Sequence, residues 1–312
     1  MSLFNMHTHL SRDTTTEKLI FPKPDVPDEQ RWANLDRVIA FMDAHDISHI
    51  ATMNVMATRA MLESRLRRAR EAGRSEAAIA EARVLLREDM RHRMREMNDW
   101  SLGAQAREPR IRAYIALDPT LFEDASIEEV DRCIALGATG IKIHPQVNEH
   151  FPDHPALRAV YERCEETGVA VLACTGLRPN ADGTVYLDPR GWVPVLRAFP
   201  RLRLVMSHFC DAAWRERVEL ARAFPQLMFD ISGGLVDATN PENHRSALPF
   251  EDGARVFREV GTERLMWGSD TQFDPMTSVA QVLRLPLTGG EQEQILSTNA
   301  LAFFGVREGS SR

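Results

Sequence analysis

Short runs of apolar residues alternate with amphipathic stretches along most of the chain. Eight runs have the length and continuous apolar character of strands buried on both faces. We predict strands at Leu3–Met6, Ile47–Met53, Ile111–Leu117, Gly140–His144, Val169–Cys174, Leu202–His208, Leu227–Ile231 and Leu265–Gly268. Between them, apolar residues at helical spacing predict helices at Trp32–Asp46, Ile127–Leu136, Pro155–Thr167, Pro189–Phe199, Trp214–Phe224 and Phe250–Val260.

Strand–helix alternation repeated eight times predicts the α/β class and a closed parallel (β/α)8 barrel of the TIM type. The chain has 312 residues, a normal length for such a barrel with insertions. We therefore expect one barrel domain spanning residues 1–312. The alternative architecture is an open, doubly wound sheet.

One stretch, residues 58–98, interrupts this alternation between the second and third strands. It is rich in Arg, Glu and Ala, and its apolar residues have helical spacing. Gly73 and Ser75 predict a break followed by a new helix N-cap. We predict a helical insertion with a solvated charged face, including i,i+4 pairs such as Glu63 with Arg67. A dimerisation surface or a lid over the site is the other interpretation.

Composition narrows the class of protein. The formal net charge of −7 argues against a general nucleic-acid binder or a protein of anionic membranes. The four cysteines lack CxxC spacing, which is typical of a reducing compartment. The first residues, MSLFNMHTHL, lack the pattern of a signal peptide, and no apolar run is long enough to span a bilayer. We expect a cytoplasmic protein with a small-molecule substrate, and the sequence leaves open whether it forms a homodimer.

Two histidines, His7 and His9, are the strongest chemical signal. Side chains at i and i+2 of a strand point to the same side, so both imidazoles can bind one metal ion. The alternative interpretation is that His7 and His9 are two surface histidines near a terminus. Three further residues, His144, His208 and Asp270, each stand where an apolar run ends. Side chains from several strand ends converge in barrel enzymes, which favours an active site at the carboxyl ends of the strands.

Taken together, the motifs resemble those of the amidohydrolase superfamily, within it the amidohydrolase-related group that also contains decarboxylases. The resemblance runs nearly end to end, except over the helical insertion. Its pieces are Asn5–His9 (NMHTH), Asn98–Trp100 (NDW), Ala116–Pro119 (ALDP), Gly140–Pro145 (GIKIHP), Ser207–His208, Trp267–Asp270 (WGSD) and Asn299–Gly305 (NALAFFG).

This resemblance implies a role for each matching residue. His7 and His9 would be metal ligands from the first strand. Asp270 would bind the metal and relay a proton, and His208 would lie beside the metal-bound water or the substrate carbonyl. The resemblance implies one divalent ion, for which we expect zinc, with manganese as the alternative.

The sequence departs from the family pattern at Cys174, where relatives commonly carry a metal-binding histidine after the fifth strand. Thiolate is a good zinc ligand, so Cys174 is a candidate ligand itself. The other interpretation is a small buried apolar residue, in which case His144 is the nearest substitute ligand. For the substrate we expect contacts with Lys142 and His144, which share one face of the fourth strand. Arg178 is a candidate carboxylate clamp, with a surface role as the alternative.

We expect a metal-dependent hydrolase that attacks a small amide, lactone or ester with a metal-activated water. The first alternative is a metal-dependent decarboxylase of a small aromatic or unsaturated carboxylic acid, because both reactions use the same metal and flanking acids. The second is a metal- or small-molecule-binding scaffold without catalysis, for which the cysteine at position 174 is the best support.

Overall fold

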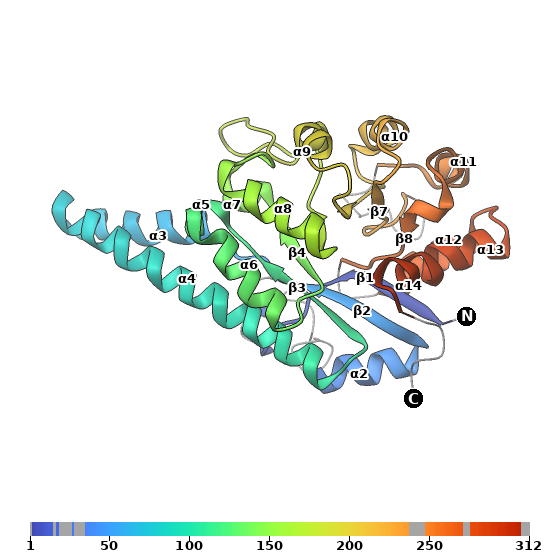
Figure 1. The fold of residues 1–312 in the computed structure, drawn as a ribbon, viewed down its shortest axis with the longest axis horizontal. Helices are drawn as coiled ribbons and strands as arrows, with labels where there is room; N and C mark the ends of the chain where they lie inside the picture. Colours follow the sequence, from blue (N-terminus) through green and yellow to red (C-terminus); the bar gives the residue numbers. More distant parts are fainter. Residues whose placement is uncertain are drawn as a thin grey trace.

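The computed structural model describes residues 2–14, 17–18, 27, 35–236, 247–270 and 275–306. Its centre is one parallel sheet of eight strands that are neighbours in chain order (Figure 1). The strands are β1 Leu3–Thr8, β2 Ile47–Met53, β3 Ile111–Ala116, β4 Gly140–Ile143, β5 Ala170–Ala173, β6 Leu204–Met206, β7 Met228–Asp230 and β8 Leu265–Met266. Sequential order confirms the predicted barrel and excludes the doubly wound sheet, whose strand order reverses.

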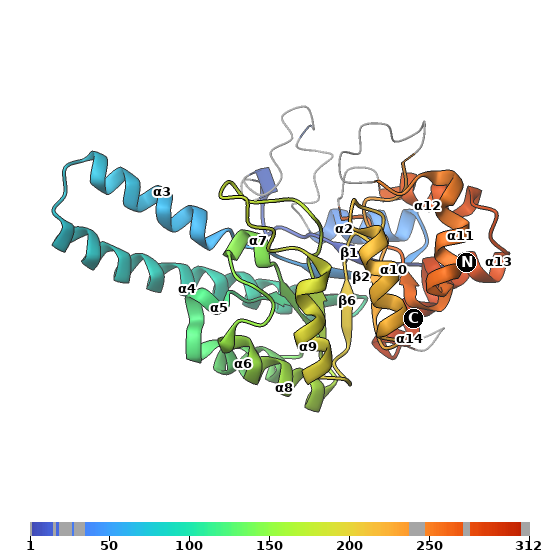
Figure 2. The ribbon, with the colours of Figure 1, turned by 90° about the horizontal axis from the view of Figure 1, so that it is seen from above.

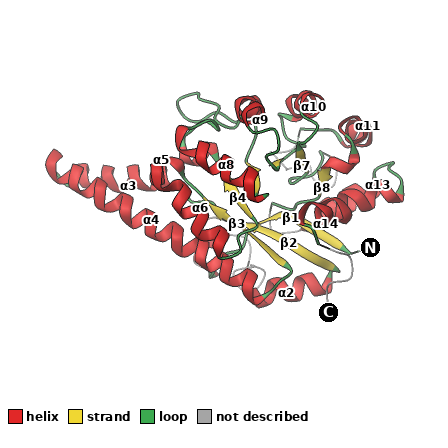
Figure 3. Cartoon of the chain, viewed as in Figure 1, coloured by secondary structure: helices red, strands yellow, loops and turns green. Residues whose placement is uncertain are grey.

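Helices surround this sheet (Figure 3). They are α2 Leu35–Ala44, α3 Thr58–Glu71, α4 Glu76–Arg107, α5 Pro119–Phe122, α6 Ser126–Ala135, α7 Pro145–Asn148, α8 Arg158–Thr167, α9 Val193–Ala198, α10 Trp214–Ala223, α11 Phe250–Val260, α12 Pro275–Arg284, α13 Gly289–Glu293 and α14 Asn299–Phe304. The first three residues of the predicted helix Trp32–Asp46 lie outside the described residues. Within the described ranges, no helix combines the length and hydropathy that a membrane span requires.

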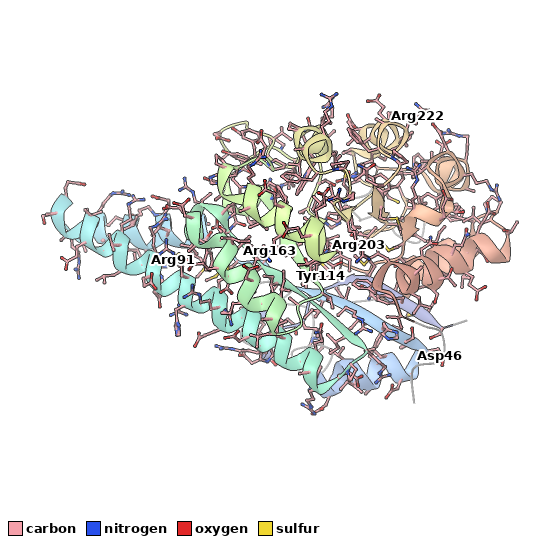
Figure 4. All side chains as sticks on the ribbon, in the orientation of Figure 1. Asp46, Arg91, Tyr114, Arg163, Arg203 and Arg222 are labelled. Carbon is pink, nitrogen blue, oxygen red and sulfur yellow. The ribbon has the colours of Figure 1, made fainter. Side chains whose placement is uncertain are left out.

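Side chains fill the barrel interior, as is usual for this fold. Phe4, Met6, Tyr114 and Leu172 belong to this inner cluster, and α14 packs against it at the amino-terminal end of the strands. There the ring of Phe304 stacks on that of Phe4, with 5.1 Å between centroids. Figure 4 labels Tyr114 and Arg203 in this region. Because this end is closed by packed aromatic side chains, the opposite, carboxyl end is the place for a site.

Helices α3 and α4 form a hairpin that extends well beyond the barrel (Figures 1 and 2). Gly73 joins them in a left-handed conformation with φ +71°, and the Ser75 hydroxyl caps α4 by accepting from the Ala78 N–H at 3.3 Å. The two helices confirm the predicted helical insertion, and Gly73 and Ser75 confirm the predicted break between them. The second helix continues to Arg107, beyond the predicted end at residue 98.

The charged pairing on the hairpin differs from the prediction. Glu63 does not pair with Arg67; it pairs with Arg70 at 3.9 Å and with Arg83 of α4 at 3.4 Å, while Arg67 pairs with Glu71. The reason is the second helix, which brings a closer cation to Glu63 than its own helix does. Figure 4 shows side chains projecting along both helices of the hairpin.

Candidate active site

The seam between β8 and β1 brings residues from the two ends of the chain together. The Met6 N–H donates to the Trp267 carbonyl at 2.8 Å, and the Asp270 N–H donates to the His7 carbonyl at 2.8 Å. A Cβ on Gly268 would lie 2.6 Å from the His7 Cβ. The glycine therefore permits the close approach of the two strands, and this approach places Asp270 beside His7.

His7, His9 and Asp270 form one compact donor set. The Nε2 atoms of His7 and His9 lie 3.4 and 3.2 Å from the same Asp270 oxygen, Oδ1. The three donor atoms all lie within 4.8 Å of one another. His9 donates from Nδ1 to the Met53 carbonyl at 2.6 Å, which leaves the Nε2 lone pair of the neutral ring directed toward the set.

Asp230, at the end of β7, orients His7. Its Oδ2 lies 2.8 Å from His7 Nδ1, while Oδ1 accepts from the backbone N–H groups of Ser232 at 2.9 Å and His208 at 3.3 Å. Burial alone would raise the pKa of Asp230, but His7 and the hydrogen bond from Ser232 hold it well below its usual value. The carboxylate is therefore ionised and keeps the proton of His7 on Nδ1.

This arrangement leaves the lone pair of His7 Nε2 free of a proton and available to a ligand, although the residue lies inside the protein. His7 is only 1% exposed, and among the described residues its Nε2 has no hydrogen-bond partner. Burial, together with the charge of Lys142, lowers the pKa of His7 to about 3, so the ring is neutral at physiological pH. Neutral imidazole is the form that binds metals. Two imidazole nitrogens and a carboxylate fit a divalent ion such as zinc or manganese.

Sequence analysis missed Asp230. The available signal was its position at the end of the seventh apolar run, the same position that pointed to His208 and Asp270. A carboxylate behind a metal-binding histidine is a common arrangement, because it fixes the tautomer and the orientation of the ring.

His208 lies beside this donor set, with its ring centroid 5.2 Å from that of His7. Its Nδ1 is 2.9 Å from the Ser232 hydroxyl, and its side chain hydrogen-bonds Cys174. Burial alone would lower the pKa of His208, but the Asp270 carboxylate and the contact with Cys174 raise it. His208 and Asp270 both have left-handed backbone conformations, with φ of +63° and +56°. Such strain in non-glycine residues is concentrated at functional sites.

Cys174 directly follows β5, as predicted, and is 5% exposed. Burial alone would raise the pKa of its thiol, but the charge of Lys142 and the hydrogen bond with His208 lower it. Within the described ranges, the compact metal-capable groups are His7 with His9 and Asp270, and His7 with His208 and Asp230. Cys174 belongs to neither group, so its role as a ligand stays a prediction.

Arg217 of α10 joins the segments that carry Cys174 and His208. It is fully buried and donates to the carbonyl and hydroxyl of Thr175, both at 2.9 Å, and to Asp211 at 2.5 Å. Thr175 follows Cys174 directly, and Asp211 lies three residues after His208. The arginine therefore holds the ends of β5 and β6 in a fixed relation.

The predicted substrate residues divide into two groups. Lys142 and His144 line a small cavity at the carboxyl ends of β2, β3 and β4, together with Asn54 and Asn148. Arg178 is exposed, and its backbone carbonyl accepts from the Gln146 side chain at 3.3 Å. The structure thus brings Lys142 and His144 together and leaves the Arg178 side chain at the surface.

Comparison with known proteins identifies the family. The amidohydrolase family model matches residues 5–306, so the chain belongs to this family of metal-dependent hydrolases and decarboxylases. A 2-amino-3-carboxymuconate-6-semialdehyde decarboxylase from Dictyostelium discoideum is 35% identical over 83 residues, which are 26% of this chain. The match spans 22% of that curated relative.

Solved structures share the fold at low identity. A 2,6-dihydroxybenzoate decarboxylase bound to 2,6-dihydroxybenzoate has a TM-score of 0.66 at 16% identity, covering 98% of this chain and 100% of that chain. A probable 2-pyrone-4,6-dicarboxylic acid hydrolase from Acinetobacter baumannii has a TM-score of 0.60 at 16% identity, with the same coverage. A dihydroxybenzoic acid decarboxylase from Polaromonas sp. JS666, with bound manganese and an inhibitor, has 0.58 at 16%, covering 97% of each chain.

Proposed function

We propose that this protein is a metal-dependent decarboxylase of a small aromatic or unsaturated carboxylic acid. His7, His9 and Asp270 would hold one divalent ion, zinc or manganese. The single observation that carries the proposal is the position of His208, a buried imidazole whose ring centroid lies 5.2 Å from that of His7 in the donor set. The decarboxylases among the relatives and structural neighbours support the same reaction.

Decarboxylation breaks the bond between a carbon atom and its carboxylate, releases CO2 and leaves an electron pair on that carbon. The carbon must then receive a proton, so the reaction needs a buried acid near neutral pH. His208 is suited to this step because its imidazole is buried beside the donor set, with the Ser232 hydroxyl 2.9 Å from its Nδ1. When bound, a divalent ion supplies Lewis-acid stabilisation of negative charge on a substrate oxygen.

Other residues of the site fix the tautomer of His7 and the orientation of His208. Asp230 keeps the His7 proton on Nδ1, so that Nε2 stays available as a ligand atom. The Ser232 hydroxyl lies 2.9 Å from His208 Nδ1 and fixes the orientation of that ring. The walls of the site bury His7 and His208 almost completely, which strengthens every electrostatic interaction there by excluding water.

Hydrolysis of a small amide, lactone or ester is the second candidate, and the pyrone hydrolase among the structural neighbours favours it. It needs the same donor set, but a base must first accept a proton from water. The decarboxylases among the relatives and structural neighbours support decarboxylation as the first candidate.

The test measures CO2 release and ester or lactone cleavage by metal-loaded protein, with 2,6-dihydroxybenzoate and related acids as substrates. We expect CO2 release that His7→Ala and Asp270→Asn each abolish, with circular dichroism unchanged. Cleavage of a lactone without CO2 release would identify a hydrolase instead. A metal-loaded protein that performs neither reaction would favour the binding scaffold.

A further inference from the structure

Residues 58–89, which form α3 and the first part of α4, make an arm that projects from the barrel (Figures 1 and 2). Since α3 has 14 residues, the arm is about 20 Å long. Leu62, Leu66 and Ile79 are buried within it, where the two helices pack together. Helices gain most of their stability from burying an apolar face against other elements. An arm of two helices leaves most of its surface without such packing.

The outward face of α4 carries the two most exposed large apolar side chains among the described residues. Val84 is 67% exposed and Leu85 is 65% exposed. Ala77, which is also exposed, lies two helical turns before Val84 on the same side of the helix. Single exposed apolar residues are ordinary on protein surfaces, but neighbouring ones mark a contact surface. This face of α4 is therefore suited to packing against another protein.

The arm also exposes unpaired charges of opposite sign. Arg68 of α3 and Glu81 of α4 are exposed, and neither forms an ion pair within the described part of the chain. The same holds for Arg74 in the turn and Glu76 at the start of α4. Neighbouring charged side chains of the arm, by contrast, pair with one another. The arm thus offers both a cation and an anion to whatever it contacts.

A second copy of this chain matches both the charges and the apolar residues. In a two-fold contact the same surface meets itself, so α3 of one copy can face α4 of the other. Arg68 of each copy then lies opposite Glu81 of the other. Two helical hairpins that meet in this way form a four-helix bundle, which buries the faces that each hairpin leaves exposed. A partner with charge of one sign, such as a nucleic acid, would match only one of the two helices.

We propose that the arm is a dimerisation surface, on which α3 and α4 of two copies pack as a four-helix bundle that buries Val84 and Leu85. This inference does not depend on the proposed function, because none of its residues belongs to the site at the carboxyl ends of the strands.

The first experiment is sedimentation velocity of the full chain over a series of concentrations. We expect the wild-type protein to form a dimer in equilibrium with its monomer. Replacing Val84 and Leu85 together by glutamine should raise the dimer dissociation constant about thirtyfold or more, because the change removes apolar contacts from both copies. The matched control replaces Leu136 and Leu283, exposed leucines outside the arm, by glutamine. It should change that constant by less than about twofold.

The second experiment tests the packing of α3 on α4 by reversing charges. Arg68→Glu and Glu81→Arg should each raise the dissociation constant about tenfold at low salt, because each places like charges opposite each other. An equimolar mixture of the two variants should form a heterodimer with nearly wild-type affinity, since opposite charges then face each other at both positions. Dimer formation on mixing also shows that both variants are folded.

Three results would overturn the proposal. The first is a wild-type chain that stays monomeric throughout the concentration series, which would leave the arm to a different partner. The second is a dimer that the change at Val84 and Leu85 weakens no more than the control does. The third is a mixture of Arg68→Glu and Glu81→Arg that dimerises no better than either variant alone.

Discussion

Replacing Asp230 by asparagine should weaken divalent metal binding by about 10- to 100-fold while the barrel stays folded. Each factor of ten corresponds to about 1.4 kcal/mol of binding free energy. The substitution keeps the size and shape of the side chain. It removes the charge and turns one acceptor oxygen into a donor.

The size of the effect follows from the contacts of the carboxylate. One oxygen accepts from His7 Nδ1, and the other accepts from the backbone N–H groups of Ser232 and His208. An asparagine that keeps its oxygen toward the backbone presents N–H to His7 and drives the proton of that ring to Nε2, the ligand atom. The reverse orientation points the amide N–H at two backbone donors. Both orientations therefore penalise the metal-binding tautomer.

The assay is a competition titration of zinc or manganese against a fluorescent chelator. Asp118→Asn is the matched control, because Asp118 is equally buried and also accepts hydrogen bonds from backbone and side chain but lies outside the donor set. Both variants should lose stability to urea, and only Asp230→Asn should lose metal affinity. A metal dissociation constant within twofold of wild type for Asp230→Asn, or an equal loss in both variants, would refute the reasoning.

Three further predictions concern other parts of the chain. Cys174→Ser should weaken metal binding more than Cys164→Ser, measured by the same titration; equal affinities would place Cys174 among the packing residues. Burial and nearby arginines lower the pKa of His49 to about 4, below the usual 6.5. As the pH drops from 6.5 to 4, the unfolded chain therefore binds a proton at His49 before the folded chain does, and the free energy of unfolding falls. His49→Gln should reduce that acid loss, by about 2 kcal/mol in urea unfolding at pH 4.5, and an unchanged pH slope would contradict this. Arg217→Met should lower the free energy of unfolding by about 3 kcal/mol, because it leaves Thr175 and Asp211 without their hydrogen-bond donor. A loss below about 1 kcal/mol would contradict that role.

The pattern of apolar residues was sufficient to predict the architecture. The strand Ile47–Met53 has the predicted bounds, because the apolar run and the hydrogen bonding to the neighbouring strands end at the same residue. The run Leu202–His208 is longer than the observed strand, Leu204–Met206. His208 lies beyond the ladder, in a left-handed turn that apolar periodicity does not reveal.

The convergence of His7, His9 and Asp270 was predictable because strand ends meet at one end of a barrel. One feature of the site was not predictable. The pairing of Asp230 with His7 depends on which neighbouring strand end faces the ring, and that depends on three-dimensional packing.

The most direct measurement is diffraction from crystals soaked in manganese or zinc, recorded at the absorption edge of the metal. We expect one strong anomalous peak, about 2.0–2.2 Å from Nε2 of His7, Nε2 of His9 and a carboxylate oxygen of Asp270. A fully loaded crystal whose anomalous peak lies away from these three side chains would contradict the metal centre on which the account is built.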